Sequence, residues 1–408
     1  MMKHVAQTAE SAQIYGIKPF CADKTVCATW LGFFSQALTK KGGNGDMRNG
    51  LRMITILLAA AACLSTGAVA DEWINLFDKE TLFGWTPFGQ GNWSVSDGNL
   101  ACDTGAGGWL ATTSQFADFE LVVKMRVEAD GSAGVAFRAG LEGHPSENGS
   151  NWITIAEPKG GASDWHEIKV TASGANVSAT VDGKEGNVMG GGRARGYIGI
   201  LYYRDGKIEV ESIKLRPLNL KPIFNGKNLD GWNIIPGRKS EFNVVDGALN
   251  IKNGNGQIET AGTYKDFCLQ LDIFSNGDHL NSGVFYRSPA GVFWKGYESQ
   301  VRNEWEGNDR AKPKDFGTGG NYGNQPARKV VSSDREWFTK TIVVDGNHAA
   351  VWVNGYLTSD FLDVRPRSLQ SQGKEGYVAG PGTITLQGHD PTTDLSFKNI
   401  VIQEYPAK

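Results

Sequence analysis

The sequence predicts an all-β protein made of two tandem β-sandwich domains, and three observations lead to this prediction. The chain of 408 residues contains 53 glycines and 12 tryptophans, and long helical periodicity is hard to find in it. Short segments of alternating apolar and polar residues are separated by Asp-Gly and Asn-Gly turn signals, a pattern typical of antiparallel strands. The chain also repeats itself, and each copy has the size of a domain rather than of a solenoid unit.

The duplication is visible in segments that match in the same order. The matching pairs are NLFDKETLFGW (75–85) with PIFNGKNLDGW (222–232), FADFELVVKMRV (116–127) with YKDFCLQLDIFS (264–275), SAGVAFR (132–138) with NSGVFYR (281–287), and KIEVESIKL (207–215) with DLSFKNIVI (394–402). Because both ends are kept in each copy, we expect the first and last strands of each copy to pair. We place the first β-sandwich at residues 71–218 and the second at residues 219–408.

The segment that begins at Met47 has the three parts of a secretory signal. Two arginines precede an apolar run, and Ala68-Val69-Ala70 follows it, so we expect a signal peptide at residues 47–70 that is cleaved after Ala70. A buried helix or a retained anchor is the alternative, but the run is short for a membrane span. We therefore expect a secreted or periplasmic protein without a transmembrane segment in the mature chain. Since a signal should begin the chain, we interpret residues 1–46 as an unstructured start-site artefact.

The charge of the chain argues against a nucleic-acid partner, and its cysteine content argues against a disulfide. The net charge is −3 and the chain has no basic run, so nothing points to a nucleic-acid partner. The mature chain would keep only Cys102 and Cys268, which stand at non-equivalent places in the two copies. We therefore expect two small buried thiols rather than a disulfide. The oligomeric state is not predictable from these features.

The two copies differ most after their shared arginine. Arg138 matches Arg287 with an offset of 149, whereas Trp165 matches Trp337 with an offset of 172, so the second copy carries about 23 additional residues between these landmarks. This stretch contains GYESQVRN (296–303), whose Glu-x-Gln has no counterpart in the first copy. Read as a strand, it places Glu, Gln and Arg on one face and Tyr, Ser and Val on the other.

Other polar side chains distinguish the second copy as well. Gln387 and His389 share one face of a later strand, and Arg287 lies on a third strand. A sheet needs none of these groups, and the first copy lacks most of them. We therefore expect a pocket lined by Arg287, Glu298, Gln300, Gln387 and His389. The alternative is a solvated outer face, and His389 could simply cap the turn that follows it.

These motifs resemble the 3-keto-disaccharide hydrolase domain family. The resemblance is carried, in order, by IFNGKNLDGW, NSGVFYR, GYESQVRN, FGTGGNYG, VWVNGY and LQGHDPTTDLSFKNI, and it covers the second copy fully and the first more weakly. It implies concanavalin-A-like jelly-roll domains, activity on glycosides oxidised at C3 of the sugar, and, for some members, a divalent metal cation. Positions of the family type map onto Asn281, Arg287, Glu298, Gln300, Gln387 and His389. The chain departs from the family at Gly319-Gly320-Asn321-Tyr322, where many members read Gly-Ala-Ile-Tyr; the tyrosine is kept.

The chemistry implied by the resemblance sets requirements for the site. A C3 ketone acidifies the hydrogen on C2, so that a base can remove it, the C1 substituent leaves by elimination, and water then adds. Glu298 or His389 is the candidate base. Arg287 or a bound cation is the candidate for stabilising the enolate, while Asn281, Gln300, Gln387 and Tyr322 are candidates for binding the substrate. Glu298 and His389 could instead be metal ligands.

Two other functions remain open at this point. The first is a lectin-like, carbohydrate-binding protein without catalysis. A flat aromatic platform without an inward carboxylate would favour this function. The second is an enzyme that acts on a non-oxidised glycan, which requires a second carboxylate within reach of Glu298. Among the nearby aromatic residues, we expect Tyr322 at the site, while Tyr297 could belong to the site or to the core. The first domain would be a degenerate copy that supports the second or helps to bind substrate.

Overall fold

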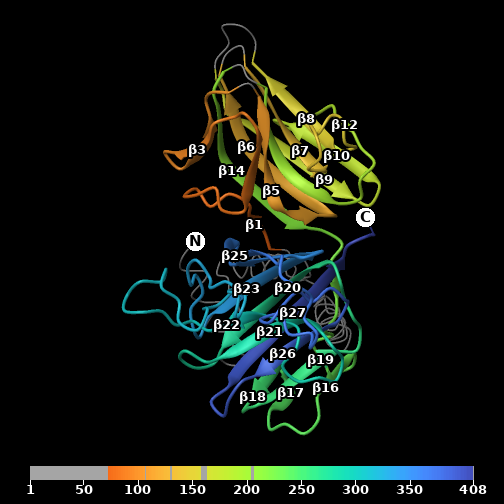
Figure 1. Cartoon of the computed structure of the whole chain (residues 1–408), viewed down its shortest axis with the longest axis vertical. Helices are drawn as coiled ribbons and strands as arrows, with labels where there is room; N and C mark the ends of the chain where they lie inside the picture. Colours follow the sequence, from red (N-terminus) through yellow and green to blue (C-terminus); the bar gives the residue numbers. More distant parts are fainter. Residues whose placement is uncertain (1–71, 106, 129–130, 158–162, 204–205, 408) are drawn as a thin grey trace, which may run out of the picture. The chain divides into compact units, whose positions relative to one another are not determined.

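The computed structural model describes residues 72–105, 107–128, 131–157, 163–203 and 206–407. The predictions for residues 1–46 and 47–70 lie outside these described residues. Within them all regular structure is β-strand, and every strand pair is antiparallel (Figure 1). None of the described residues forms a helix able to cross a membrane.

The first sandwich consists of strands β1 to β14. Its larger sheet has the order β11 (Lys184–Glu185), β10 (Asn176–Val181), β9 (His166–Ser173), β6 (Phe119–Val127), β14 (Ile208–Pro217), β4 (Asn99–Cys102) and β3 (Trp93–Ser96), with β1 (Ile74–Asn75) paired to β14. Its smaller sheet has the order β12 (Met189–Gly190), β8 (Asn151–Ala156), β7 (Ser132–Ala139), β13 (Gly196–Tyr202), β5 (Gly108–Phe116) and β2 (Trp85–Gly89).

The second sandwich repeats this plan with strands β15 to β27. Its larger sheet has the order β17 (Glu241–Val245), β18 (Ala248–Lys252), β27 (Asp394–Glu404), β20 (Phe267–Ser275), β23 (Trp337–Asp345), β24 (His348–Val353) and β25 (Tyr356–Leu362), with β15 (Lys221–Pro222) paired to β27. Its five-stranded sheet has the order β16 (Trp232–Ile234), β19 (Gly256–Thr260), β26 (Thr383–Gly388), β21 (Ser282–Ser288) and β22 (Tyr297–Val301). The pairing of β1 with β14 and of β15 with β27 confirms that the first and last strands of each copy meet.

The core follows from the alternation of the strands. In β6, every second residue from Phe119 to Val127 is buried, and the residues between them are half-buried. In the second sandwich, apolar side chains of both sheets, such as Leu269 from β20 and Leu386 from β26, meet in one buried cluster. The hydrophobic effect of these inward faces holds the sheets together. Cys102 and Cys268 are buried free thiols, as expected.

The small sheets of the two sandwiches are bonded in the same order, so positions can be compared between them. The order β5-β13-β7-β8 of the first corresponds to β19-β26-β21-β22 of the second. SAGVAFR lies on β7 and NSGVFYR on β21, which makes Gly134 the counterpart of Gly283. From this pair, the strand registers assign a counterpart to each neighbouring residue.

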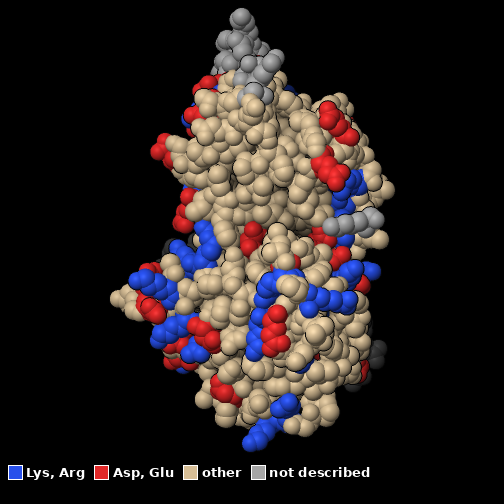
Figure 2. Space-filling view, viewed as in Figure 1, with Lys and Arg blue, Asp and Glu red and all other residues tan. Residues whose placement is uncertain are grey.

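Figure 2 shows that Lys and Arg are interspersed with Asp and Glu on the face in view.

Candidate active site

The candidate site lies on the face of the five-stranded sheet that is turned away from the core. One row of residues runs across four strands in register, and it consists of Glu259, Thr385, Phe285 and Glu298. In the next row on this face, Gln257 pairs with Gln387, and Gly283 pairs with Gln300. The intervening residues, such as Leu386 and Val284, are buried in the core. The alternation of strands thus gathers polar groups from four strands on one face.

Glu298 is the buried carboxyl group of this face. Only 6% of the residue is exposed, and its side chain occupies the space above Gly283, where a β-carbon would collide with it. Burial raises the pKa of Glu298 to about 8, and the nearby Asp315 carboxylate adds to this rise. A hydrogen bond from the Trp294 side chain and the charges of Lys340 and Lys374 act in the opposite direction. A carboxyl group of this kind exchanges its proton near neutral pH.

A narrow pocket opens beside Glu298. It is lined by Phe285, Trp294, Gly296, Glu298, Tyr322, Gln372 and Lys374. Trp294 is 40% exposed, and the Lys374 Nζ lies 4.2 Å from the centroid of its ring. The pocket therefore combines one buried acid, one cation and three aromatic side chains.

Two polar side chains of the sheet hold the loop that carries Trp294. The backbone N–H of Trp294 donates to Gln257 Oε1 at 2.7 Å, and the N–H of Gly291 donates to Glu259 Oε1 at 2.8 Å. Trp294 has a φ of 57°, a left-handed conformation that is uncommon for a large side chain. Gln257 and Glu259 were not singled out from the sequence, because pairing across strands is invisible there.

A second acidic residue, Asp315, stands close to the site. Its Oδ2 accepts hydrogen bonds from Asn281 Nδ2 at 3.0 Å and from Gln300 Nε2 at 3.1 Å, and Arg302 Nη1 lies 3.3 Å away. Asp315 and the following Phe316 both have positive φ, of 46° and 67°. Strained backbone of this kind often marks a functional loop. The structure therefore joins two residues predicted at the site, Asn281 and Gln300, through an aspartate that the sequence analysis missed.

Three buried polar atoms on this face have no hydrogen-bond partner among the described residues. They are Gln257 Nε2, Asn281 Oδ1 and Gln387 Oε1. Their residues are at most 8% exposed. A buried polar atom that lacks a hydrogen bond costs about 1–3 kcal/mol, so native proteins seldom tolerate three near one another. One donor and two acceptors match the hydrogen-bonding capacity of a polyhydroxylated ligand.

Comparison with protein families places this arrangement in context. The sequence model of the family described as 3-keto-alpha-glucoside-1,2-lyase-like domain matches residues 72–216 and again residues 219–403. The chain belongs to this family. The two adjacent matches agree with tandem copies, and membership supports a carbohydrate-active, hydrolase-like function.

Solved structures of similar fold include two putative glycosyl hydrolases from Parabacteroides distasonis ATCC 8503. One is 24% identical with a TM-score of 0.38, and the match covers 46% of this chain and 99% of the other chain. The other is 21% identical with a TM-score of 0.37, and covers 46% and 94%. The carbohydrate-binding module CBM66 from Bacillus subtilis is 12% identical with a TM-score of 0.27, and covers 32% and 94%. These values are too low to bear on activity. No curated protein matches the chain.

Within this member of the lyase-like family, the first sandwich lacks the polar face. Trp109 stands at the position of Gln257, and Ala111 at that of Glu259. Leu201 stands at the position of Gln387. Trp152 and Thr154 stand at the positions of Glu298 and Gln300. Trp109, Ala111 and Leu201 form a separate buried apolar cluster, against which Trp152 packs. The same face is therefore apolar in one copy and polar in the other, so the fold does not require the polar set.

The structure corrects the prediction for Arg287. Its guanidinium donates to the backbone carbonyls of Lys265 and Val378 and pairs with Asp266. Arg138 makes the same kind of contacts in the first sandwich, to the Ala117 carbonyl and Asp118. Both arginines have positive φ and interrupt the pairing of their strands, so the simple alternation fails at this position. Arg287 is a structural clamp present in both copies.

The remaining predicted residues lie at different places. Tyr322 lines the Glu298 pocket, whereas His389 lies in the turn after β26, where its side chain is 44% exposed and its Nδ1 lies 2.9 Å from Asp390 Oδ2. Tyr297 is a core residue, because its ring stacks on Tyr286 and its hydroxyl donates to Asp363 at 2.7 Å.

The part of the chain that the structure describes holds no typical cluster of acidic and histidine metal ligands. Within the described ranges, no group of three or more His, Cys, Asp or Glu residues is placed to bind a metal ion. The alternative in which Glu298 or His389 binds a metal ion together with Asn or Gln oxygens stays a prediction.

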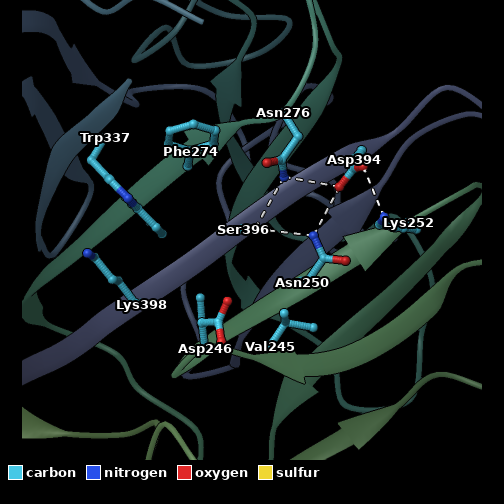
Figure 3. Close-up of a pocket in the computed structure, with 11 residues that line it drawn as sticks. Val245, Asp246, Asn250, Lys252, Phe274, Asn276, Trp337, Asp394, Ser396 and Lys398 are labelled. Atoms are coloured by element: carbon cyan, nitrogen blue, oxygen red, sulfur yellow. Dashed lines mark hydrogen bonds and ion pairs between the residues drawn. The ribbon is translucent and has the colours of Figure 1, made fainter. Parts of the chain in front are cut away.

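A larger hollow lies on the outer face of the other sheet. Figure 3 shows the amides of Asn250 and Asn276 turned toward Asp394 and Ser396, to which they donate at 3.0–3.2 Å. Asp394, Ser396 and the two amides thus bind one another, unlike the three unpartnered atoms on the face that carries Glu298. We therefore place the candidate site in the smaller pocket.

Proposed function

We propose that the second sandwich cleaves 3-keto-glycosides by elimination and that Glu298 is the base. The observation that carries this proposal is a buried carboxyl group with a pKa of about 8 in a pocket with aromatic walls. In its ionised form, Glu298 takes the proton from C2, and the electron pair of that C–H bond moves toward the C3 ketone as an enolate. The enolate then re-forms the ketone and expels the C1 oxygen substituent. Water adds to the C1=C2 bond, which gives net hydrolysis.

The other residues of the site receive roles from their positions. Lys374 supplies the positive charge beside Glu298 and stabilises the enolate in place of Arg287. Tyr322 lines the pocket, and its hydroxyl is our candidate for protonating the leaving oxygen. Gln257, Asn281 and Gln387 bind sugar hydroxyls through their unpartnered atoms.

A second candidate function is supported by Asp315. This carboxylate acts electrostatically on Glu298, so a pair of carboxyl groups is present, as ordinary glycoside hydrolysis requires. However, its Oδ2 is already engaged by two amides and an arginine. We therefore rank direct hydrolysis of a non-oxidised glycan second. A lectin-like function without catalysis ranks third, because a buried carboxyl group such as Glu298 is not needed in a plain aromatic platform.

One assay separates these functions. The purified protein is offered a 3-keto-glucoside and the matching ordinary glucoside, each with an added divalent metal or with EDTA, beside the Glu298→Gln variant. We expect cleavage of the keto substrate only, and at least a 100-fold loss in the variant. Cleavage of the ordinary glucoside would favour the Asp315-dependent alternative. Sugar binding without any cleavage would favour the lectin-like function.

A further inference from the structure

Lys340 is a buried lysine directly beneath the strand that carries Glu298. It belongs to β23 in the opposite sheet and is 0% exposed. Its Nζ donates to the Gln300 carbonyl at 2.8 Å, to the Ser299 hydroxyl at 3.1 Å and to the Ser299 carbonyl at 3.2 Å. The lysine therefore crosses the core and holds β22 at Ser299, the residue between Glu298 and Gln300.

The first sandwich shows that the fold does not need this lysine. Lys340 pairs with Leu271, and the matching pair in the first sandwich is Ile168 with Val123. Ser299 pairs with Val284, and its counterpart Ile153 pairs with Val135. Ile168 and Ile153 are both buried in the core of the first sandwich. A buried amine costs stability that an isoleucine does not, so its presence only beneath the polar face calls for a functional reason.

We propose that Lys340 is a positioning residue for Glu298: it fixes β22 from the core side and supplies the charge that balances the ionised carboxylate. This role rests on the proposed function of Glu298, although the coupling between the two residues can be measured without any substrate. Lys340 contacts no part of the pocket, so it acts through Glu298 and the backbone of β22.

The titratable groups around Glu298 come from three elements. Asp315 and Tyr322 belong to the long loop after β22, Lys374 to the loop before β26, and Lys340 to β23. Asp315 opposes ionisation of Glu298, whereas both lysines favour it. Burial lowers the pKa of Lys340 to about 7, and the Glu298 charge raises it. Loss of the Glu298 proton therefore favours the ammonium form of Lys340, which limits the charge buried in the site.

The test measures the titration of Glu298 directly. The protein is labelled with ¹³C at the glutamate side-chain carboxyl, and the Glu298 signal is assigned by its loss in Glu298→Gln. The variants are Lys340→Met and the double variant Lys340→Ile with Ser299→Ile, which copies the pair in the first sandwich. We expect both to raise the titration midpoint of Glu298 by about one pH unit or more. Ser299→Ala, which keeps the lysine and its bonds to both carbonyls, should leave the midpoint nearly unchanged.

Activity adds a readout that a merely structural lysine would not move. On a 3-keto-glycoside, the double variant should keep the thermal stability of the parent, lose at least tenfold in kcat, and shift the pH dependence of kcat/KM upward. An unchanged Glu298 midpoint and pH profile in both lysine variants would overturn the proposal. If the parent cleaves no 3-keto-glycoside, the function proposed above fails, while the titration still decides the role of Lys340.

A reciprocal measurement covers the case in which the lysine variants do not fold. In Glu298→Gln, the buried lysine loses its carboxylate, so the midpoint of Lys340, followed by ¹⁵N labelling of lysine side chains, should fall. A Lys340 midpoint that is the same in Glu298→Gln and the parent would also overturn the proposal.

Discussion

Glu298 lies over Gly283 of the neighbouring strand, and the missing side chain of that glycine makes room for the carboxyl group. A β-carbon on Gly283 would collide with the Glu298 side chain. The carboxyl group is thereby held over the sheet and next to Trp294 and Tyr322. This contact links a small residue that occurs in both copies to a glutamate that occurs in one.

Gly283→Ala should displace Glu298 and lower kcat/KM on a 3-keto-glycoside at least tenfold. Precise placement of a catalytic base is worth this much or more. Gly380→Ala is the matched control, because a β-carbon there meets no neighbouring atom. Equal activity of the two variants would show that the position of Glu298 does not matter.

The pH dependence of activity should reflect the ionisation of Glu298. Because the base form requires loss of its proton, kcat/KM should rise with pH through about 8 and then level off. The residual activity of Glu298→Gln should lack this rise. A rise near pH 4.5, the ordinary pKa of a glutamate, would contradict the buried, proton-holding state.

The Glu298 carboxyl group should also make the free energy of unfolding depend on pH. The folded protein holds the Glu298 proton up to about pH 8, whereas the unfolded chain releases it near 4.5. Between these values the folded state binds more protons, so the stability contribution of this group falls by up to about 1.4 kcal/mol per pH unit. Glu298→Gln should therefore gain stability relative to the parent from pH 5 to pH 8, as measured by urea unfolding. A constant difference across this range would refute the assignment.

Arg287 and Arg138 should behave alike. Replacing either with Met removes a buried guanidinium together with its hydrogen bonds to backbone carbonyls and to a half-buried aspartate, which costs about 3 kcal/mol. Urea unfolding of the two variants measures this cost. Provided the protein is folded, the pH profile of Arg287→Met should keep its rise near 8. A loss of activity in folded Arg287→Met that Arg138→Met does not share would restore a catalytic role to Arg287.

Gln387→Leu should separate binding from stability. Leu201 occupies the corresponding position in the first sandwich, and the change removes a buried oxygen without a partner. Thermal stability should stay equal or rise, whereas KM should increase about tenfold because a hydrogen bond to the substrate is lost. A destabilised variant with an unchanged KM would assign Gln387 to the fold instead.

The fold was predictable because its signals are local or repeated. Alternation within β6 and the duplicated segments defined two sandwiches without any knowledge of their contacts. Alternation also put Glu298 and Gln300 on one face, which the structure bears out for their position on β22.

The rest of the site depends on contacts that a single sequence does not display. Gln257 reaches the site through register across two strands, and Asp315 through a loop with two left-handed residues. Arg287 was misassigned because the chain departs from regular alternation at that residue. A signal against its catalytic role was nevertheless present, since its match Arg138 stands in the copy without the polar face.

The most direct test of the central claim is cleavage of a 3-keto-glycoside in D₂O, with the product examined by NMR. Elimination followed by addition of water predicts one deuterium at C2 of the released sugar, formed faster than exchange of the free product and absent with Glu298→Gln. Cleavage that leaves the original hydrogen at C2 would contradict proton abstraction by Glu298 and would indicate direct hydrolysis.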